Sequence, residues 1–339
     1  MFGISKKLFF SIIYSILYPY RFCRNKKQER QRYYAGKAFE RQYYAEKANF
    51  QKPKKGENMD FIEILKTIAL GIIEGITEWL PVSSTGHLII AEKFLTLNVG
   101  REGFFEVFKY VVQLGAIIAV IVLFWNKMFP FQFKDKTQPK VRKDVFAVWF
   151  KVVVACVPGA IVTILFDDLI EQYLSSALVV AITLIVYGVA FIVIEKINKK
   201  RTPLVNDLSE ITYLTALYIG LFQVLSIIPG TSRSGATILG ALILGVSRTA
   251  AAEFTFFLAV PVMIGMSLIK IVKFVVTVGM FTATELLVIG IGMLTAFVVS
   301  LLVIKFLLNF IKKNDFTAFG WYRIILGCVV LSLFIANVI

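Results

Sequence analysis

The chain has 339 residues, of which 58% are hydrophobic and 17% are charged, whereas soluble domains average about 45–50% apolar and about 25% charged residues. Its formal net charge is +15. The basic residues lie between long apolar runs, which argues against a nucleic-acid-binding protein and is typical of the positive-inside pattern of membrane proteins. The three cysteines are far apart in the sequence, so they indicate neither a disulfide framework nor a CxxC metal site.

Residues 1–58 differ in composition from the rest of the chain. Within residues 21–57 there are twelve Lys and Arg and four Glu. The preceding apolar run at 8–20 is shorter than the about 20 residues that a spanning helix needs. We expect residues 1–58 to be a basic extension, either a surface helix or a disordered arm attracted to anionic lipid headgroups. Alternatively, translation starts at Met59. In either case, residues 59–339 form the membrane domain.

Apolar segments separated by short polar links make up the sequence after residue 60. Their approximate ranges are 61–80, 85–97, 108–126, 145–166, 174–195, 211–228, 234–246, 253–274, 285–311 and 321–338. The first and second segments, and the sixth and seventh, are separated by a cluster of Pro with Ser or Thr, and the second member of each pair is too short to span a bilayer. Each pair therefore predicts a re-entrant helical hairpin whose break faces protein or a water-filled cavity.

The charges of the links predict the orientation. Three links are basic, at 127–143, 196–201 and 312–313, and basic links are expected in the cytoplasm. A link with Asp167, Asp168 and Glu171 is acidic and is expected outside. We predict an all-α polytopic membrane protein with an inverted repeat, each half with one re-entrant helical hairpin and three transmembrane helices. Such a repeat places a site near the midplane between two broken helices. This orientation puts residues 1–58 outside, against the positive-inside tendency.

The first break has the sequence GIIEGITEWLPVSSTGHL. Glu74 and Glu78 are four residues apart and therefore share one helix face. A charge at membrane depth costs at least about 2.5–3.5 kcal/mol, so the two carboxylates need a cation, a proton or a water cavity. They can bind a divalent metal through hard oxygen ligands, or share one proton. An alternative is an interfacial helix whose carboxylates reach water.

Hydroxyl groups and the only histidine follow Pro81 in the same break. These residues are Ser83, Ser84, Thr85 and His87. If a helix restarts there, Ser84 and His87 lie within reach of each other, which suggests a nucleophile and its base. His87 can also attack phosphorus itself or transfer a proton near neutral pH. A lone histidine is more often structural, but a serine pair and two glutamates close by favour a functional role.

The second break has the sequence SIIPGTSRSGATILG. Pro229 and Gly230 can unwind the backbone, and hydroxyl groups surround Arg233: Thr231, Ser232, Ser234 and Thr237. A helix that begins near Ser232 would direct free amides and its positive dipole end toward an oxyanion, and a guanidinium binds phosphate with two hydrogen bonds. This pattern predicts an anion site. The alternative is helix capping with Arg233 extended to the headgroups.

The two breaks resemble the undecaprenyl-diphosphate phosphatase family of the bacitracin-resistance type. Glu74 and Glu78 match the family's glutamate-rich motif, PVSSTGH carries its serine pair and histidine, and residues 229–237 match PGxSRSxxT. The resemblance extends over about residues 60–339 and leaves residues 1–58 aside. It implies hydrolysis of undecaprenyl diphosphate to undecaprenyl phosphate for peptidoglycan synthesis, bacitracin resistance, a divalent cation such as Mg²⁺ or Ca²⁺, and a site open to the outer face of the bacterial plasma membrane.

Together, the residues and the resemblance suggest roles for the site. The expected catalytic residues are Glu78, Ser84, His87 and Arg233; the expected substrate-binding residues are Ser83, Thr85, Gly230, Ser232, Ser234 and Thr237; the expected metal ligands are Glu74 and Glu78. The sequence leaves open whether Ser84 or His87 is the nucleophile, because phosphoryl transfer depends mainly on positioning and charge neutralisation.

Two other classes of function remain as alternatives. A transporter or flippase of an anionic polyprenyl lipid would also use an inverted repeat with broken helices, but it needs no nucleophile. A structural protein with a lipid-binding arm leaves the ionisable residues at membrane depth unexplained. The expected partners are the polyprenyl diphosphate and the bilayer, with no nucleic acid. The sequence is compatible with a homodimer and leaves the oligomeric state open.

Overall fold

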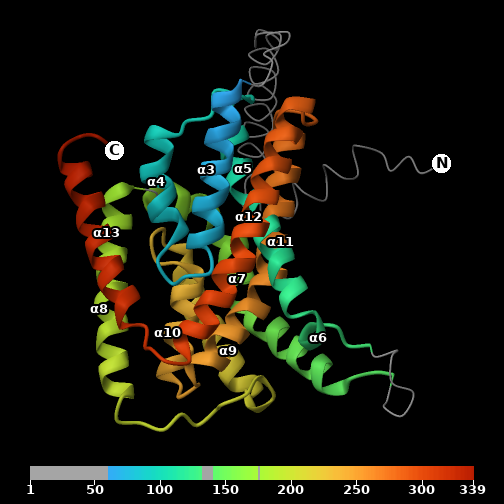
Figure 1. The fold of residues 1–339 in the computed structure, drawn as a ribbon, viewed down its shortest axis with the longest axis vertical. Coiled ribbons are helices and arrows are strands. Elements are labelled where there is room, and N and C mark those ends of the chain that lie inside the picture. The colour runs from blue at the N-terminus through green and yellow to red at the C-terminus, as the bar shows by residue number, and fades with distance from the viewer. Residues whose placement is uncertain (1–59, 132–139, 175) are drawn as a thin grey trace, which may run out of the picture. The chain divides into compact units, whose positions relative to one another are not determined.

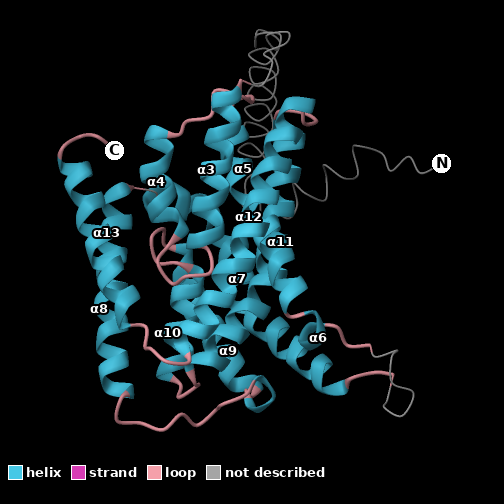
Figure 2. Ribbon diagram, viewed as in Figure 1, coloured by secondary structure: helices cyan, strands magenta, loops and turns pink. Residues whose placement is uncertain are grey.

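The computed structural model describes residues 60–131, 140–174 and 176–339. These residues are mainly helical and contain no β-strand, only two isolated β-bridges (Figure 2). The expectations for residues 1–58 lie outside the described residues. The all-α class predicted from the sequence is therefore confirmed for the described part of the chain.

The helices follow the predicted apolar segments closely. In chain order they are α3 (Phe61–Thr77), α4 (Ser84–Phe94), α5 (Phe104–Leu123), α6 (Trp125–Met128), α7 (Lys143–Leu174), α8 (Ala177–Asn198), η1 (Leu208–Glu210), α9 (Tyr213–Val224), η2 (Leu225–Ile227), α10 (Arg233–Ile243), α11 (Arg248–Thr277), α12 (Ala283–Ile311) and α13 (Thr317–Ile335). Residues 167–171 lie between the apolar spans 143–163 and 177–198, as expected of a link, but their backbone continues the helix of α7. The acidic side chains there resemble a link in composition, but no Pro or Gly stops the helix.

Six of the described helices are long and apolar enough to cross a membrane: α5, residues 143–163 of α7, α8, α11, α12 and α13. The protein is thus a multi-pass membrane protein. The helices on either side of the two breaks are shorter, with 17, 11, 12 and 11 residues in α3, α4, α9 and α10. At 1.5 Å per residue, an 11-residue helix is about 16 Å long, roughly half of the about 30 Å hydrocarbon core.

The short helices pack on long helices from the other part of the chain. Helix α3 packs on α12, whereas α9 packs on α7 (Figure 1). Helices α5 and α11 contact each other, and α8 lies along α13. The basic links lie at one end of the bundle. Lys127 pairs with Glu253 near the start of α11, Arg248 at that start pairs with Glu195 near the end of α8, and Lys199 at the end of α8 pairs with Asp315.

Glycines allow α8 and α13 to approach closely. A Cβ atom placed on Gly320 would lie 2.8 Å from the carbonyl oxygen of Gly188, and one placed on Gly188 would lie 2.7 Å from that of Gly320. Small residues at such crossings let helix backbones meet in membranes, where association depends on van der Waals packing.

We expect Gly320→Ala to lower the thermal unfolding midpoint of the purified protein in detergent. The added methyl group forces the two backbones apart, and overpacking of this kind costs typically about 1–3 kcal/mol. Gly290→Ala on α12 is the control, since the described residues leave the space around its Cβ position open. Equal midpoints for the two variants would contradict the close packing of α8 on α13.

Candidate active site

The two breaks share one local backbone geometry. Ser83 has φ 74° and ψ 102°, and Ser232 has φ 69° and ψ 124°. Each serine caps the helix that follows, because its hydroxyl accepts a hydrogen bond from the amide of Gly86 (3.3 Å) or Gly235 (3.2 Å). Positive φ at a residue other than glycine costs of the order of 1–3 kcal/mol. The helices that follow begin at Ser84 and Arg233, so the helix start expected near Ser232 is confirmed.

The two breaks contact each other through backbone carbonyl groups. The Ser234 hydroxyl donates a hydrogen bond to the carbonyl oxygen of Glu78 at 3.1 Å and lies 3.5 Å from that of Leu80. Figure 2 shows the loops of the two breaks between α4 and α10. Carbonyl groups that a broken helix leaves free must find donors at membrane depth, and here the second break supplies one to the first.

Glu78 joins residues from both breaks. Its Oε1 accepts a hydrogen bond from Nη2 of Arg233 at 2.9 Å, and its Oε2 accepts one from the Ser84 hydroxyl at 3.0 Å. The side chains of Arg233 and Glu78 are only 11% and 9% exposed. The structure therefore brings three of the expected catalytic residues together, with a largely desolvated ion pair beside a hydroxyl group.

His87 lies on α4, one helical turn beyond Ser84, and has other partners. Its Nδ1 is 2.7 Å from the carbonyl oxygen of Ser83, and its Nε2 is 2.7 Å from the hydroxyl of Tyr322. The rings of His87 and Tyr322 are stacked, with centroids 5.6 Å apart. Ser84 donates to Glu78, so the structure does not show the direct Ser84–His87 hydrogen bond that the spacing suggested.

Glu74 is buried with both carboxylate oxygens free. It is 2% exposed, and neither oxygen has a hydrogen-bond partner among the described residues. Glu78, Gln113 and Arg233 lie close enough to interact with it electrostatically. An unsatisfied buried polar group costs about 1–3 kcal/mol, and a charged one costs more. The side chain therefore fits a site that binds a cation or a proton.

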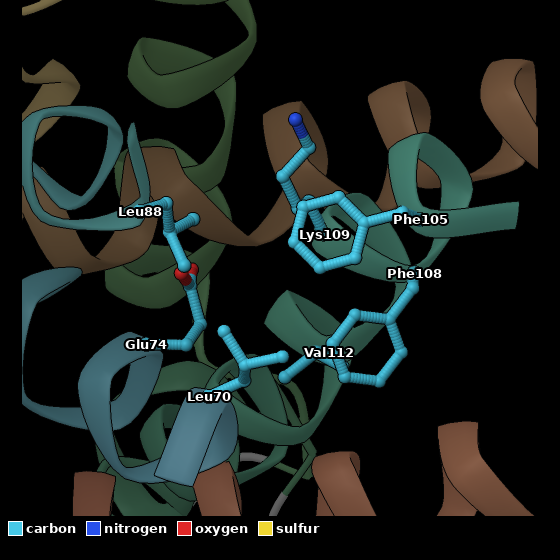
Figure 3. A pocket seen from close by; sticks show the side chains of 7 residues that line it. All are labelled: Leu70, Glu74, Leu88, Phe105, Phe108, Lys109 and Val112. Atoms are coloured by element: carbon cyan, nitrogen blue, oxygen red, sulfur yellow. The ribbon is translucent and has the colours of Figure 1, made fainter. Parts of the chain in front are cut away.

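A small hollow of about 10 Å³, about the space of one water molecule, lies beside Glu74, between α3, α4 and α5 (Figure 3). It is lined by Leu70, Glu74, Leu88, Phe105, Phe108, Lys109 and Val112. The Lys109 ammonium points away from Glu74 in this view and pairs with Glu106 at 2.6 Å. Glu74 is thus the one carboxylate among the lining residues and has no counter-ion there.

The carboxylates of Glu74 and Glu78 are suitable ligands for a divalent cation that the substrate also binds. The described residues contain no group of three or more His, Cys, Asp and Glu placed to hold a metal ion. Mg²⁺ is commonly bound by one or two carboxylates together with substrate phosphates and water. Glu74 offers two free oxygens, and each oxygen of Glu78 keeps a second lone pair. These two residues therefore fit such an ion.

The other expected substrate-binding residues differ in their surroundings. Gly230 has φ 89°, and a Cβ there would lie 2.2 Å from the Thr183 hydroxyl oxygen, so the turn requires glycine. The Thr237 hydroxyl donates to the carbonyl oxygen of Arg233 within its own helix. Ser83 is buried, and Thr85 is exposed on α4. Ser232 lies 3.2 Å from Ser234 between their hydroxyl oxygens.

Two residues of α13 contact the site and were not predicted from the sequence. Arg323 is 0% exposed. Its Nη1 donates to the carbonyl oxygen of Pro81 (3.2 Å), and its Nη2 donates to those of Gly230 and Thr231 (both 2.9 Å). The neighbouring Tyr322 contacts His87. An arginine inside an apolar segment is itself a signal of function, and that signal could have identified Arg323.

Comparison with known proteins gives consistent matches. A family model described as "Bacitracin resistance protein BacA" matches residues 67–329. A protein named undecaprenyl-diphosphatase from Enterococcus faecalis is 63% identical over 275 residues, which are 81% of this chain and 98% of the relative. Proteins of the same name from Acetivibrio thermocellus and Lachnoclostridium phytofermentans are 54% and 56% identical, over 81% and 82% of this chain and 99% of each relative.

Proposed function

The chain belongs to the bacitracin resistance protein BacA family, and from this premise we infer that it is an undecaprenyl-diphosphatase. It hydrolyses undecaprenyl diphosphate to undecaprenyl phosphate and inorganic phosphate, which recycles the lipid carrier of peptidoglycan synthesis and confers resistance to bacitracin. The Ser84–Glu78–Arg233 cluster is the structural observation that best supports this function. It joins a hydroxyl, a carboxylate and a guanidinium across the two breaks.

The architecture that we propose is an inverted repeat with two re-entrant hairpins. The shared geometry of Ser83 and Ser232 supports it, as does the packing of α3 on α12 and of α9 on α7. The basic links lie at one end of the bundle, and basic links favour the cytoplasm. The site then opens toward the outer face of the bacterial plasma membrane, and the prenyl chain of the substrate stays in the lipid.

In the proposed mechanism, the second break binds the terminal phosphate. The α10 N-terminus offers free amides, and Arg233 offers N–H groups beyond the one that Glu78 accepts. Glu78 takes the proton of Ser84 as the Ser84 oxygen forms a bond to the terminal phosphorus. The bond from phosphorus to the bridging oxygen breaks, and undecaprenyl phosphate leaves. Water activated by His87 then hydrolyses the phosphoserine and releases inorganic phosphate.

A divalent cation, Mg²⁺ or Ca²⁺, held by Glu74 and Glu78 would neutralise charge on the substrate phosphates. The unpartnered oxygens of Glu74 support this assignment. The test begins with phosphate release from undecaprenyl diphosphate by purified protein in detergent. Micelles have no two sides, so release there separates a phosphatase from the flippase alternative. We expect a chelator to abolish release and added Mg²⁺ or Ca²⁺ to restore it.

We expect Glu74→Gln to raise the metal concentration that gives the half-maximal rate, because an amide oxygen is a weaker ligand for a hard cation than a carboxylate. Metal titrations of wild type and variant at one pH measure this effect. Glu102→Gln is the matched control, since Glu102 is exposed between α4 and α5. If the Glu74→Gln curve superimposes on that of wild type after scaling its height, Glu74 does not bind the metal.

A further inference from the structure

Helix α13 presents a tyrosine to the only histidine of the chain. We propose that the Tyr322 hydroxyl orients the imidazole of His87 by donating a hydrogen bond to Nε2 and passes a proton from water to that nitrogen, while the Ser83 carbonyl keeps the ring hydrogen on Nδ1. The catalytic consequence of this role rests on the proposed function, in which His87 activates water. The role itself follows from the contacts of the ring.

The hydrogen-bond partners determine the tautomer of His87. A backbone carbonyl can only accept, so the 2.7 Å contact of Nδ1 with the carbonyl oxygen of Ser83 requires a hydrogen on Nδ1. In the neutral ring, Nε2 then carries a lone pair, and the Tyr322 hydroxyl at 2.7 Å donates to it. The hydrogen bond that one ring nitrogen of a histidine makes determines whether the other nitrogen carries a hydrogen. Within the ring, only the Nε2 lone pair can accept the hydrogen bond that the Tyr322 hydroxyl donates.

The rings of His87 and Tyr322 lie nearly parallel to each other. The His87 and Tyr322 rings are 10° from parallel, with centroids 5.6 Å apart. Tyr322 is 46% exposed, and a tyrosine with that exposure often serves only to anchor a helix at the membrane interface. Tyr322 differs from such interfacial tyrosines because its hydroxyl contacts His87, one helical turn beyond Ser84 of the Ser84–Glu78–Arg233 cluster.

The next residue in sequence holds Tyr322 in register with both breaks. Arg323 donates to carbonyl oxygens of Pro81 in the first break and of Gly230 and Thr231 in the second. Gly320, two residues before Tyr322 on α13, meets the α8 backbone. Buried contacts on the neighbouring residues thus set the position of Tyr322, and its own exposed surface contributes little to it.

Nitrogen NMR of the imidazole tests the proposal without turnover. Because the chain has one histidine, ¹⁵N-histidine labelling of the full chain, with the purification tag removed, gives one pair of ring signals. We expect a protonated Nδ1 and an unprotonated, hydrogen-bonded Nε2 in the wild type. Tyr322→Phe keeps the ring but removes the donor, so its Nε2 signal should shift. Tyr218→Phe on α9, where the tyrosine is 44% exposed, should leave both signals unchanged.

Kinetics supplies the second readout. We expect Tyr322→Phe to lower kcat about tenfold, a part of the about 10²- to 10⁴-fold that general acid–base catalysis contributes, and to leave KM within about twofold. Unchanged imidazole signals in Tyr322→Phe would overturn the proposal, and so would a loss of kcat shared equally by Tyr218→Phe. If the wild type releases no phosphate, the proposed function fails, whereas the NMR result still decides the role of Tyr322.

Discussion

Replacement of Arg233 by lysine is expected to reduce kcat/KM for undecaprenyl diphosphate by about 10²- to 10³-fold, the loss typical of removing one donor to a developing oxyanion. Arg233 uses Nη2 to bind Glu78 at 2.9 Å, and its Nη1 lies 3.4 Å from the carbonyl oxygen of Thr255. The planar guanidinium can keep these contacts and still direct other N–H groups toward a phosphate. An ammonium keeps the charge but loses this geometry.

Phosphate release in detergent measures the effect, and thermal unfolding shows that the variant is folded. Arg248→Lys is the matched control. Arg248 also pairs with a buried glutamate, Glu195, but this pair lies at the end of α8, away from the two breaks. We expect the control to keep its activity. Turnover close to that of wild type in Arg233→Lys would remove Arg233 from the phosphate site.

Arg323→Met is expected to abolish activity and to lower the thermal midpoint. The variant leaves three buried carbonyl oxygens, those of Pro81, Gly230 and Thr231, without the donor that the structure shows. Each such group costs about 1–3 kcal/mol, so the expected destabilisation is several kcal/mol. The two breaks also lose their common anchor, so Arg233 and Ser84 no longer meet at Glu78.

Thermal unfolding and phosphate release of Arg323→Met, Arg323→Lys and Lys305→Met test this expectation. Lysine should restore stability only in part, because one ammonium cannot donate to all three carbonyl oxygens from the positions of Nη1 and Nη2. Lys305 is an exposed cation on α12, and its replacement should change neither quantity. A midpoint for Arg323→Met equal to that of Lys305→Met would show that Arg323 does not hold the two breaks.

The positions of the helices could be predicted from the sequence because they depend on local signals. Long apolar runs define the spanning helices, and Pro81 and Pro229 with nearby serines mark the two breaks. The polar residues of both breaks were also visible, since ionisable groups at membrane depth are rare. The acidic stretch at 167–171 correctly marked the separation of two spans, but its composition did not show that the helix of α7 continues through it.

Contacts between distant residues could not be predicted in the same way. Tyr322 meets His87 across 235 positions of sequence, and nothing near either residue encodes that contact. The partner of Ser84 could not be predicted either, although it lies only six residues away. Its spacing suggested His87, but the left-handed backbone at Ser83 turns the chain so that Ser84 meets Glu78, six residues earlier.

The order of synthesis gives the contacts between the breaks another consequence. Carbonyl groups of Glu78 and Pro81 obtain their donors from Ser234 and Arg323, which are 156 and 242 positions later in the chain. At about 5–20 residues per second, the last of these leaves the ribosome on the order of tens of seconds after the first break. Until α13 inserts, the nascent chain holds unsatisfied carbonyl groups at membrane depth. A chain that ends before α13 therefore lacks the donor that the carbonyl groups of Pro81, Gly230 and Thr231 share in the complete fold.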